Sequence, residues 1–274
     1  MHILEINDLE ISNDKPLILI SGPCVIESRD HSLKMAESIY EICNDIGINF
    51  IYKSSFDKAN RTNIKSVRGV GLEQAIKIFE EIKNNFNCPI ITDVHNEDQC
   101  QIIGQTDIVD IIQIPAFLCR QTDLLLSAGK TKKIVNVKKG QFLSPSEIPN
   151  IIEKIETTKN FKIMLTERGT SFGYNNLISD FRSIEIMKQY KYPIIFDATH
   201  SVQEPGGVGK STGGKREFVP ILATAAVSLG VAGLFIETHD DPDNAPSDGP
   251  NMLKIQDLKN LLLKLKKYDE LAKS

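Results

Sequence analysis

The chain has 274 residues, of which 41% are hydrophobic and 25% charged, a composition typical of a folded globular protein. Its net charge of -4 and pI of about 5.8 argue against a broad nucleic-acid-binding surface. Its apolar runs are too short to span a membrane, and its polar N-terminus does not resemble a signal peptide. The five cysteines follow no tight spacing, which favours reduced thiols and a cytoplasmic protein.

Short apolar segments alternate along the chain with longer segments of helical periodicity. The predicted strands, in chain order, cover residues 17–23, 50–55, 89–95, 109–115, 134–138, 162–168, 193–200 and 233–239. The predicted helices cover residues 31–46, 72–86, 146–157, 176–190, 218–230 and 253–271, with two shorter ones at 97–104 and 122–128. Strands that are apolar throughout predict a parallel sheet covered by helices.

This alternation predicts a single α/β domain over residues 1–274, a closed (β/α)8 TIM barrel. Eight strand–helix units in about 250 residues are what this fold requires. A doubly wound open sheet stays the structural alternative. The leading segment 3–11 precedes the repeat and predicts a short β-hairpin, which we expect to cap the lower end of the barrel.

Polar side chains follow nearly every predicted strand at its carboxyl end. They include Cys24, Lys53, Asp93, Gln113, Lys138, Arg168, His200 and Glu237. In a (β/α)8 barrel these ends form one rim, and the active site lies there. Polar residues could simply mark where strands stop, but the amino ends of the same strands mostly lack such side chains. The pattern therefore favours one functional rim.

Several of the residues near this rim are cationic. They are Lys53, Lys58, Arg61, Lys138 and Arg168, with Arg120 just past the fourth strand. Lys and Arg at buried strand ends cost desolvation free energy unless an anion pairs with them. The set predicts a ligand with more than one phosphate or carboxylate group. The alternative, that each cation pairs with a rim Asp or Glu, stays open, most of all for the loop residues Lys58 and Arg120.

A second set of residues contains metal-ligand types: Cys24, His200, Glu237 and Asp248. A thiolate, an imidazole and carboxylates suit a divalent metal such as Zn²⁺ or Fe²⁺. The spacing forms no local motif, so these residues meet only if the first and last strands are neighbours, as closure of the barrel demands. Cys24 could instead be a core residue, and His95 and His239 are rival ligands.

The run Gly206-Gly-Val-Gly-Lys-Ser-Thr212 looks like a phosphate-binding loop but lacks its first glycine, because Glu204 stands at that position. We therefore reject a nucleotide site. The run instead predicts a pliable loop just after His200.

Seven motifs in order closely resemble the 3-deoxy-D-manno-octulosonate 8-phosphate synthases, from about Leu17 to Met252. They are YKSSFDKANRTN (52–63), TDVH (92–95), QIPAFLCRQTDLL (113–125), NVKKGQF (136–142), TERGTSFGYNNL (166–177), FDATHSVQ (196–203) and IETHDDPDNAPSDGPNM (236–252). The resemblance implies a (β/α)8 barrel that assembles as a homotetramer. It also implies condensation of phosphoenolpyruvate with D-arabinose 5-phosphate, with release of phosphate, for the lipopolysaccharide inner core.

The resemblance also assigns roles to residues of this sequence. Phosphoenolpyruvate would be held by Lys53, Ser55, Lys58, Gln113, Lys138 and Arg168. Arabinose 5-phosphate would be held by Asn60, Arg61 and Thr62, and by Arg120 reaching from a neighbouring subunit. The family usually carries Ser at the position of Thr62, so the hydroxyl is kept. The catalytic residues would be Lys53, Asp93, Lys138 and His200.

The family includes metal-dependent members, which carry Cys in the motif of the first strand, and metal-independent members, which carry Asn there. This sequence has Cys24, so the resemblance implies one divalent metal ion, such as Zn, Fe or Mn, held by Cys24, His200, Glu237 and Asp248.

Two other functions stay open. A synthase that uses erythrose 4-phosphate shares the phosphoenolpyruvate half of the site, but there the loop typically reads Lys-Pro-Arg-Thr, whereas here it reads Lys58-Ala-Asn-Arg61. A non-catalytic barrel that binds sugar phosphate would need the cations but not the metal set.

Overall fold

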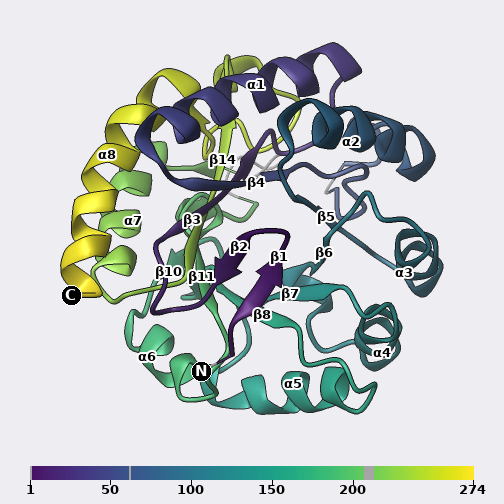
Figure 1. Cartoon of the computed structure of the whole chain (residues 1–274), viewed down its shortest axis with the longest axis vertical. Helices are drawn as coiled ribbons and strands as arrows, with labels where there is room; N and C mark the ends of the chain where they lie inside the picture. Colours follow the sequence, from purple (N-terminus) through teal and green to yellow (C-terminus); the bar gives the residue numbers. More distant parts are fainter. Residues whose placement is uncertain (1, 62, 207–212) are drawn as a thin grey trace.

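The computed structural model describes residues 2–61, 63–206 and 213–274. Within these residues, eight parallel strands form a closed barrel, and eight α-helices surround it (Figure 1). The strands pair in the order β3, β4, β5, β6, β7, β8, β11 and β14, and β14 pairs in turn with β3. The predicted (β/α)8 barrel is therefore confirmed, and an open sheet is excluded because the first and last strands are hydrogen-bonded.

The barrel strands are β3 (Ile18–Gly22), β4 (Asn49–Lys53), β5 (Ile90–Asp93), β6 (Ile111–Ile114), β7 (Ile134–Lys138), β8 (Ile163–Glu167), β11 (Ile194–Asp197) and β14 (Gly233–His239). The helices are α1 (Arg29–Ile46), α2 (Leu72–Phe86), α3 (Glu97–Gly104), α4 (Thr122–Lys130), α5 (Ile148–Glu156), α6 (Arg182–Lys188), α7 (Val219–Val227) and α8 (Ile255–Ala272). Among these helices, none has the length and apolar composition that crossing a membrane requires.

Short strands lie outside the barrel or at its edge: β1 (Leu4–Ile6), β2 (Leu9–Ile11), β9 (Thr170–Ser171), β10 (Leu177–Ile178), β12 (Gln203–Glu204), β13 (Gly213–Gly214) and β15 (Leu253–Lys254). One of them corrects a predicted helix. The helix expected over residues 176–190 begins only at Arg182, because β10 pairs antiparallel with β9. The strand expected over 193–200 ends at Asp197, and His200 begins a 3-10 turn, His200–Val202.

The predicted N-terminal hairpin is present and caps one end of the barrel. In β1 and β2 the apolar residues face inward while Glu5 and Glu10 stay exposed, the alternation expected of a half-buried ribbon. Its inward side chains join the barrel interior, which contains Leu4, Ile6, Leu9, Ile11, Ile18, Ile20, Ile51, Ile91, Ile111, Ile134, Met164, Ile195 and Phe235. Figure 1 shows this hairpin within the ring of strands. The barrel is therefore closed at the end opposite the predicted site.

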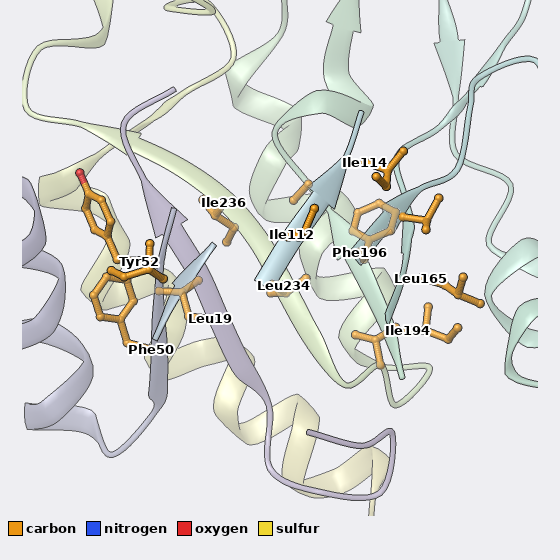
Figure 2. Close-up of a cluster of buried hydrophobic side chains, with 14 of the residues drawn as sticks. Leu19, Phe50, Tyr52, Ile112, Ile114, Leu165, Ile194, Phe196, Leu234 and Ile236 are labelled. Atoms are coloured by element: carbon orange, nitrogen blue, oxygen red, sulfur yellow. The ribbon is translucent and has the colours of Figure 1, made fainter. Parts of the chain in front are cut away.

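A larger apolar core lies between the strands and the surrounding helices. Figure 2 shows the strand residues of this layer, which point away from the barrel axis. They include Leu19, Phe50, Tyr52, Ile112, Leu165, Phe196 and Leu234. Because side chains alternate along a strand, these outward residues fix which of their neighbours point inward.

Candidate active site

The functional side chains continue the inward-facing rows of the barrel interior. In β4 the interior residue Ile51 is followed two positions later by Lys53, and in β11 Ile195 is followed by Asp197. The two-residue period of a strand puts such pairs on one face. The same rule places Asp93, Gln113, Lys138, Arg168 and Glu237 above the interior core at the carboxyl ends of their strands.

A cavity of about 700 Å³ opens at this rim. The predicted residues that line it are Lys53, Ser55, Lys58, Asn60, Arg61, Asp93, Gln113, Lys138, Arg168, His200 and Asp248. Cys24 and Glu237 are buried directly beneath, in contact with the lining residues Asp248 and Lys53. The structure therefore brings the two predicted residue sets together at one site, with the exception of Arg120.

Two predicted residues are not placed in this site. Thr62 lies outside the described residues. Arg120 is exposed, and its backbone carbonyl accepts a hydrogen bond from Nζ of Lys154 at 3.0 Å. Arg120 is not among the lining residues of this chain's own cavity. Its predicted role in a neighbouring subunit stays a prediction.

The predicted metal ligands converge from four separate segments. Ligand atoms of Cys24, Glu237 and Asp248 all lie within 4.8 Å of one another, and Sγ of Cys24 is 3.2 Å from Oδ2 of Asp248. Nε2 of His200 lies 3.5 Å from Oε2 of Glu237 and 3.8 Å from Oδ2 of Asp248. The four residues are thus close enough to share one ion.

The local chemistry of these side chains fits a divalent cation. Oε2 of Glu237 is buried and makes no hydrogen bond to the described residues. Burial and the nearby Glu237 raise the pKa of the Cys24 thiol, so a thiolate there needs a compensating positive charge. The rival ligands His95 and His239 are engaged elsewhere, with Asp93 and Glu27 respectively.

Two buried lysines at the rim are paired with carboxylates. Nζ of Lys53 lies 2.6 Å from Oε1 of Glu237, and Nζ of Lys138 contacts Oδ2 of Asp197. Nζ of Lys138 also lies 3.4 Å from the ring centre of Phe235, a cation–π distance. The alternative considered from the sequence, that rim cations pair with rim acids, therefore holds for Lys53 and Lys138 in this structure.

Other polar groups at the cavity have unused hydrogen-bonding capacity. Nη2 of Arg168 donates to Oε1 of Gln203, but its Nη1 is buried without a partner among the described residues. Oε1 of Gln113 is also buried and has no hydrogen-bond partner among the described residues. Buried polar groups are rarely left unpaired, so these atoms point to a ligand or to water in the cavity.

Asp93 is the centre of a short hydrogen-bonded chain along one wall. Its carboxylate accepts from Oγ of Ser55 and lies 3.0 Å from Nε2 of His95. Nζ of Lys58 donates to Oγ of Ser55 at 3.0 Å. Burial alone would raise the pKa of Asp93, but His95 and Lys58 outweigh it and hold the pKa below its usual range. Asp93 is therefore an anion flanked by proton donors.

Arg61 joins the loop after β4 to the segment that carries Asp248. It donates to Oγ of Ser247 at 2.9 Å and to the carbonyls of Val67 and Pro246 at 2.8 and 3.3 Å. Ser247 Oγ in turn lies 3.1 Å from Sγ of Cys24. One serine hydroxyl thus separates a cation of the outer cavity from the predicted metal ligands.

Three site residues are absent from the sequence-based assignments: Asp197, Gln203 and Ser247. Asp197 is fully buried between Lys138 and His200, and its place in the inward row of β11 could have identified it. Gln203 bridges Arg168 and Asp248, and Ser247 contacts Cys24. Gln203 lies in the two-residue strand β12 and Ser247 in a loop, and neither segment has a periodicity that indicates which way its side chain points.

Comparisons with known proteins identify the family of this chain. Residues 2–274 match the model of a family described as the DAHP synthetase I family. A protein of Bartonella henselae named 2-dehydro-3-deoxyphosphooctonate aldolase is 59% identical over 271 residues, which are 99% of this chain and 96% of that protein. Proteins with the same name from Rickettsia bellii and Rickettsia peacockii are 57% and 56% identical, over 99% of this chain and 98% of each relative.

Proposed function

The chain belongs to the DAHP synthetase I family, and from that premise we propose that it condenses phosphoenolpyruvate with D-arabinose 5-phosphate and water. The products are 3-deoxy-D-manno-octulosonate 8-phosphate and inorganic phosphate. The observation that carries this activity is the name shared by relatives 55–59% identical over nearly the whole chain, 2-dehydro-3-deoxyphosphooctonate aldolase, another name for this synthase. The enzyme is a transferase that forms a carbon–carbon bond, in the synthesis of the lipopolysaccharide inner core.

Phosphoenolpyruvate has a phosphate and a carboxylate, and the deep part of the cavity provides matching cations. Lys53 and Lys138 are the last residues of β4 and β7, Arg168 directly follows β8, and each of the three is at most 5% exposed. Nη1 of Arg168, which has no partner among the described residues, is available for bidentate binding, and the lysines act as point charges. Ser55, Lys58 and Gln113 complete this subsite.

The arabinose phosphate binds nearer to the mouth, where Asn60 and Arg61 follow the first cations in sequence. Arg61 donates hydrogen bonds to neutral acceptors. A phosphate dianion would be a stronger acceptor than these and would take their place. The sequence Lys58-Ala-Asn-Arg61 favours this sugar over erythrose 4-phosphate. Thr62 and the Arg120 of a neighbouring subunit belong to the same proposed subsite.

The reaction starts from the nucleophilic C3 of the enol phosphate. C3 attacks the aldehyde carbon of the open-chain sugar, whose oxygen takes up a proton to become a hydroxyl. Water adds to the positively charged C2 and loses a proton, and the hemiketal phosphate then releases phosphate by C–O cleavage. Fixed cations near the two anionic groups lower the barrier by holding both substrates in place and stabilising developing charge. Asp93 with His95 is positioned to carry these protons.

We further propose that Cys24, His200, Glu237 and Asp248 hold one divalent metal ion. Such an ion supplies Lewis-acid polarisation of an oxygen or a bound water of lowered pKa. Its positive charge would also offset Glu237 and Asp248, so that Lys53 would be available for the substrate anion.

We also propose that the protein is a cytoplasmic homotetramer. A homotetramer accounts for the exposed position of Arg120, which would act on the cavity of a neighbour. The five cysteines are buried and unpaired, which fits a reducing cytoplasm.

The test is consumption of phosphoenolpyruvate by the metal-loaded protein with either sugar phosphate, with the product identified by mass spectrometry. We expect consumption with arabinose 5-phosphate and the mass of an eight-carbon sugar acid phosphate. A preference for erythrose 4-phosphate would overturn the roles of Asn60 and Arg61. Binding of both substrates without phosphate release would instead indicate a sugar-phosphate sensor.

A further inference from the structure

The loop that carries Cys24 leaves the barrel between β14 and β4. Backbone pairing of β3 with β14 ends at Gly22 and Glu237. Beyond that point the chain turns toward β4, where the backbone of Ser55 bonds with that of Cys24 and of Ile26 at 3.3 and 2.9 Å. Among the described residues, the hydrogen bonds that join this loop to the end of β14 therefore involve side chains.

One of these contacts joins Glu27 in the loop to His239, the last residue of β14. Oε1 of Glu27 lies 2.7 Å from Nε2 of His239. The His239 side chain is 6% exposed and that of Glu27 is 28% exposed, so the pair is shielded but reachable by solvent. Glu27 is three residues after Cys24, and His239 is two residues after Glu237.

The nearest neighbour of Nδ1 of His239 favours one tautomer, since the backbone N–H of Asp241 is closer to Nδ1 than is Oδ1 of Asp240, at 3.3 Å. The backbone N–H of Asp241 donates to Nδ1 at 2.9 Å, so Nδ1 carries a lone pair and Nε2 carries the proton. Nε2–H therefore donates to Glu27, and any acceptor oxygen at the position of Glu27 can take its place.

A second set of contacts joins the start of α1 to Asp240, the residue after β14. Nε2 of His31, in the first turn of α1, lies 3.0 Å from Oδ1 of Asp240, and Nζ of Lys34 lies 2.7 Å from Oδ2 of the same carboxylate. The rings of His31 and His239 are 4.6 Å apart. The loop and the start of α1 are thus fastened to the end of β14 at two successive points.

We propose that Glu27 is a positioning residue that acts through His239. It ties the Cys24 loop to β14 and thereby fixes the Cys24 sulfur beside Glu237 and Asp248. The inference deepens the proposed function, because it assigns a task to residues just outside the proposed metal site.

Glu27, His31 and His239 also lie close enough to bind a cation together. The tautomer argues against that use. A metal on Nε2 of His239 would displace the proton while Nδ1 still accepts from Asp241, whereas a metal-bound histidine normally donates from its other nitrogen.

The first test measures protection of Cys24 in metal-free protein. Alkylation by iodoacetamide is followed for each cysteine by peptide mass spectrometry, and Cys43, Cys88, Cys100 and Cys119 serve as internal controls because all are buried. In Glu27→Ala we expect Cys24 to react about tenfold faster, because one charge-assisted hydrogen bond no longer opposes opening of the loop. The four controls should react as in the wild type. Glu27→Gln keeps an acceptor oxygen and should restore protection.

The second test titrates Co²⁺ and reads the sulfur-to-cobalt absorption band. Glu27→Ala should bind Co²⁺ about ten- to a hundredfold more weakly, the usual cost of losing an outer contact of a metal site, and Glu27→Gln should bind as the wild type does. Arg29→Ala, which removes an exposed ion pair with Glu81 at the start of α1, is the matched control.

Three results would overturn the tether. They are unchanged Cys24 reactivity in Glu27→Ala, faster reaction of all five cysteines, and loss of a second bound cobalt with Cys24 still protected. The two proposals can fail separately. If the wild type releases no phosphate from phosphoenolpyruvate, the proposed activity is refuted. If Cys24 still reacts faster in Glu27→Ala than in that wild type, the tether is supported all the same.

Discussion

Nδ1 of His200, in the 3-10 turn that follows β11, lies 2.8 Å from Oδ2 of Asp197, the last residue of that strand. An ionised carboxylate only accepts hydrogen bonds, so Nδ1 carries the proton and Nε2 is free to face Glu237 and Asp248. Burial would lower the pKa of His200, but Asp197 and Glu237 outweigh it and raise the pKa. Asp197 thus orients the imidazole for the role proposed for it.

We therefore expect Asp197→Asn to weaken metal binding. An amide can present its N–H₂ to Nδ1 and favour the wrong tautomer, and loss of such an outer partner typically costs about ten- to a hundredfold in metal affinity. The measurement is a competition titration with a chromogenic chelator. Asp180→Asn, at an exposed ion pair with Arg182, is the control. Unchanged affinity in Asp197→Asn would contradict the orienting role.

The barrel itself could be predicted from the sequence, and the reason lies in its strands. Strands buried on both faces are continuous apolar runs, and eight of them alternating with helical periodicity leave few other architectures. Strand ends were less predictable. The strand expected over 193–200 stops at Asp197 because the backbone N–H of His200 bonds to the Asp197 carboxylate in a tight turn.

The site was predictable where it lies on strands and much less so where it lies on loops. In β4 and β14 every second residue points inward, and this alternation identifies Lys53 and Glu237 as inward-facing residues. No such rule places Ser247 beside Cys24, because the loop between β14 and α8 brings it there only in the folded chain. The pairing of Lys53 with Glu237 likewise depends on barrel closure, which no local pattern encodes.

Removing the charge of Lys53 should destabilise the metal-free protein. Lys53 and Glu237 are 2% and 1% exposed, so Lys53→Met leaves a buried carboxylate without its cation. Breaking a buried ion pair costs about 3–5 kcal/mol in the free energy of unfolding. Lys53→Met with Glu237→Gln should recover much of that loss, as measured by urea unfolding. Additive losses in the double variant would show that the two charges do not stabilise each other.

Arg61→Ala should affect one substrate only. We expect the KM for arabinose 5-phosphate to rise by about tenfold or more, the effect of losing a hydrogen bond to a charged group, while the KM for phosphoenolpyruvate stays the same. Arg68→Ala removes a nearby exposed arginine that pairs with Asp57 and is the matched control. Equal increases for both substrates would place Arg61 outside the sugar-phosphate subsite.

The Asp93–His95 pair predicts a pH-dependent contribution to stability. Burial would lower the pKa of His95, but the hydrogen bond and charge of Asp93 outweigh it and raise the pKa. The folded protein then binds this proton more tightly than the unfolded chain, where histidine titrates near about pH 6.5. The stabilisation is complete below that pH and is lost as the pH rises through the folded-state value.

His95→Gln should therefore reduce the free energy of unfolding more at about pH 6 than at about pH 9. Urea unfolding of the wild type and the variant at both pH values provides the comparison. The same loss at both pH values would mean that the His95 charge does not stabilise the fold.

The most direct test of the account is turnover of phosphoenolpyruvate and arabinose 5-phosphate by chelator-treated protein whose metal content has been verified, before and after addition of Mn²⁺ or Zn²⁺. We expect no phosphate release without metal, recovery on addition of about one equivalent, and no recovery in Cys24→Ala. Full turnover by verified metal-free wild type would contradict this expectation, and would leave Cys24 as a buried core residue beside an active site that needs no ion.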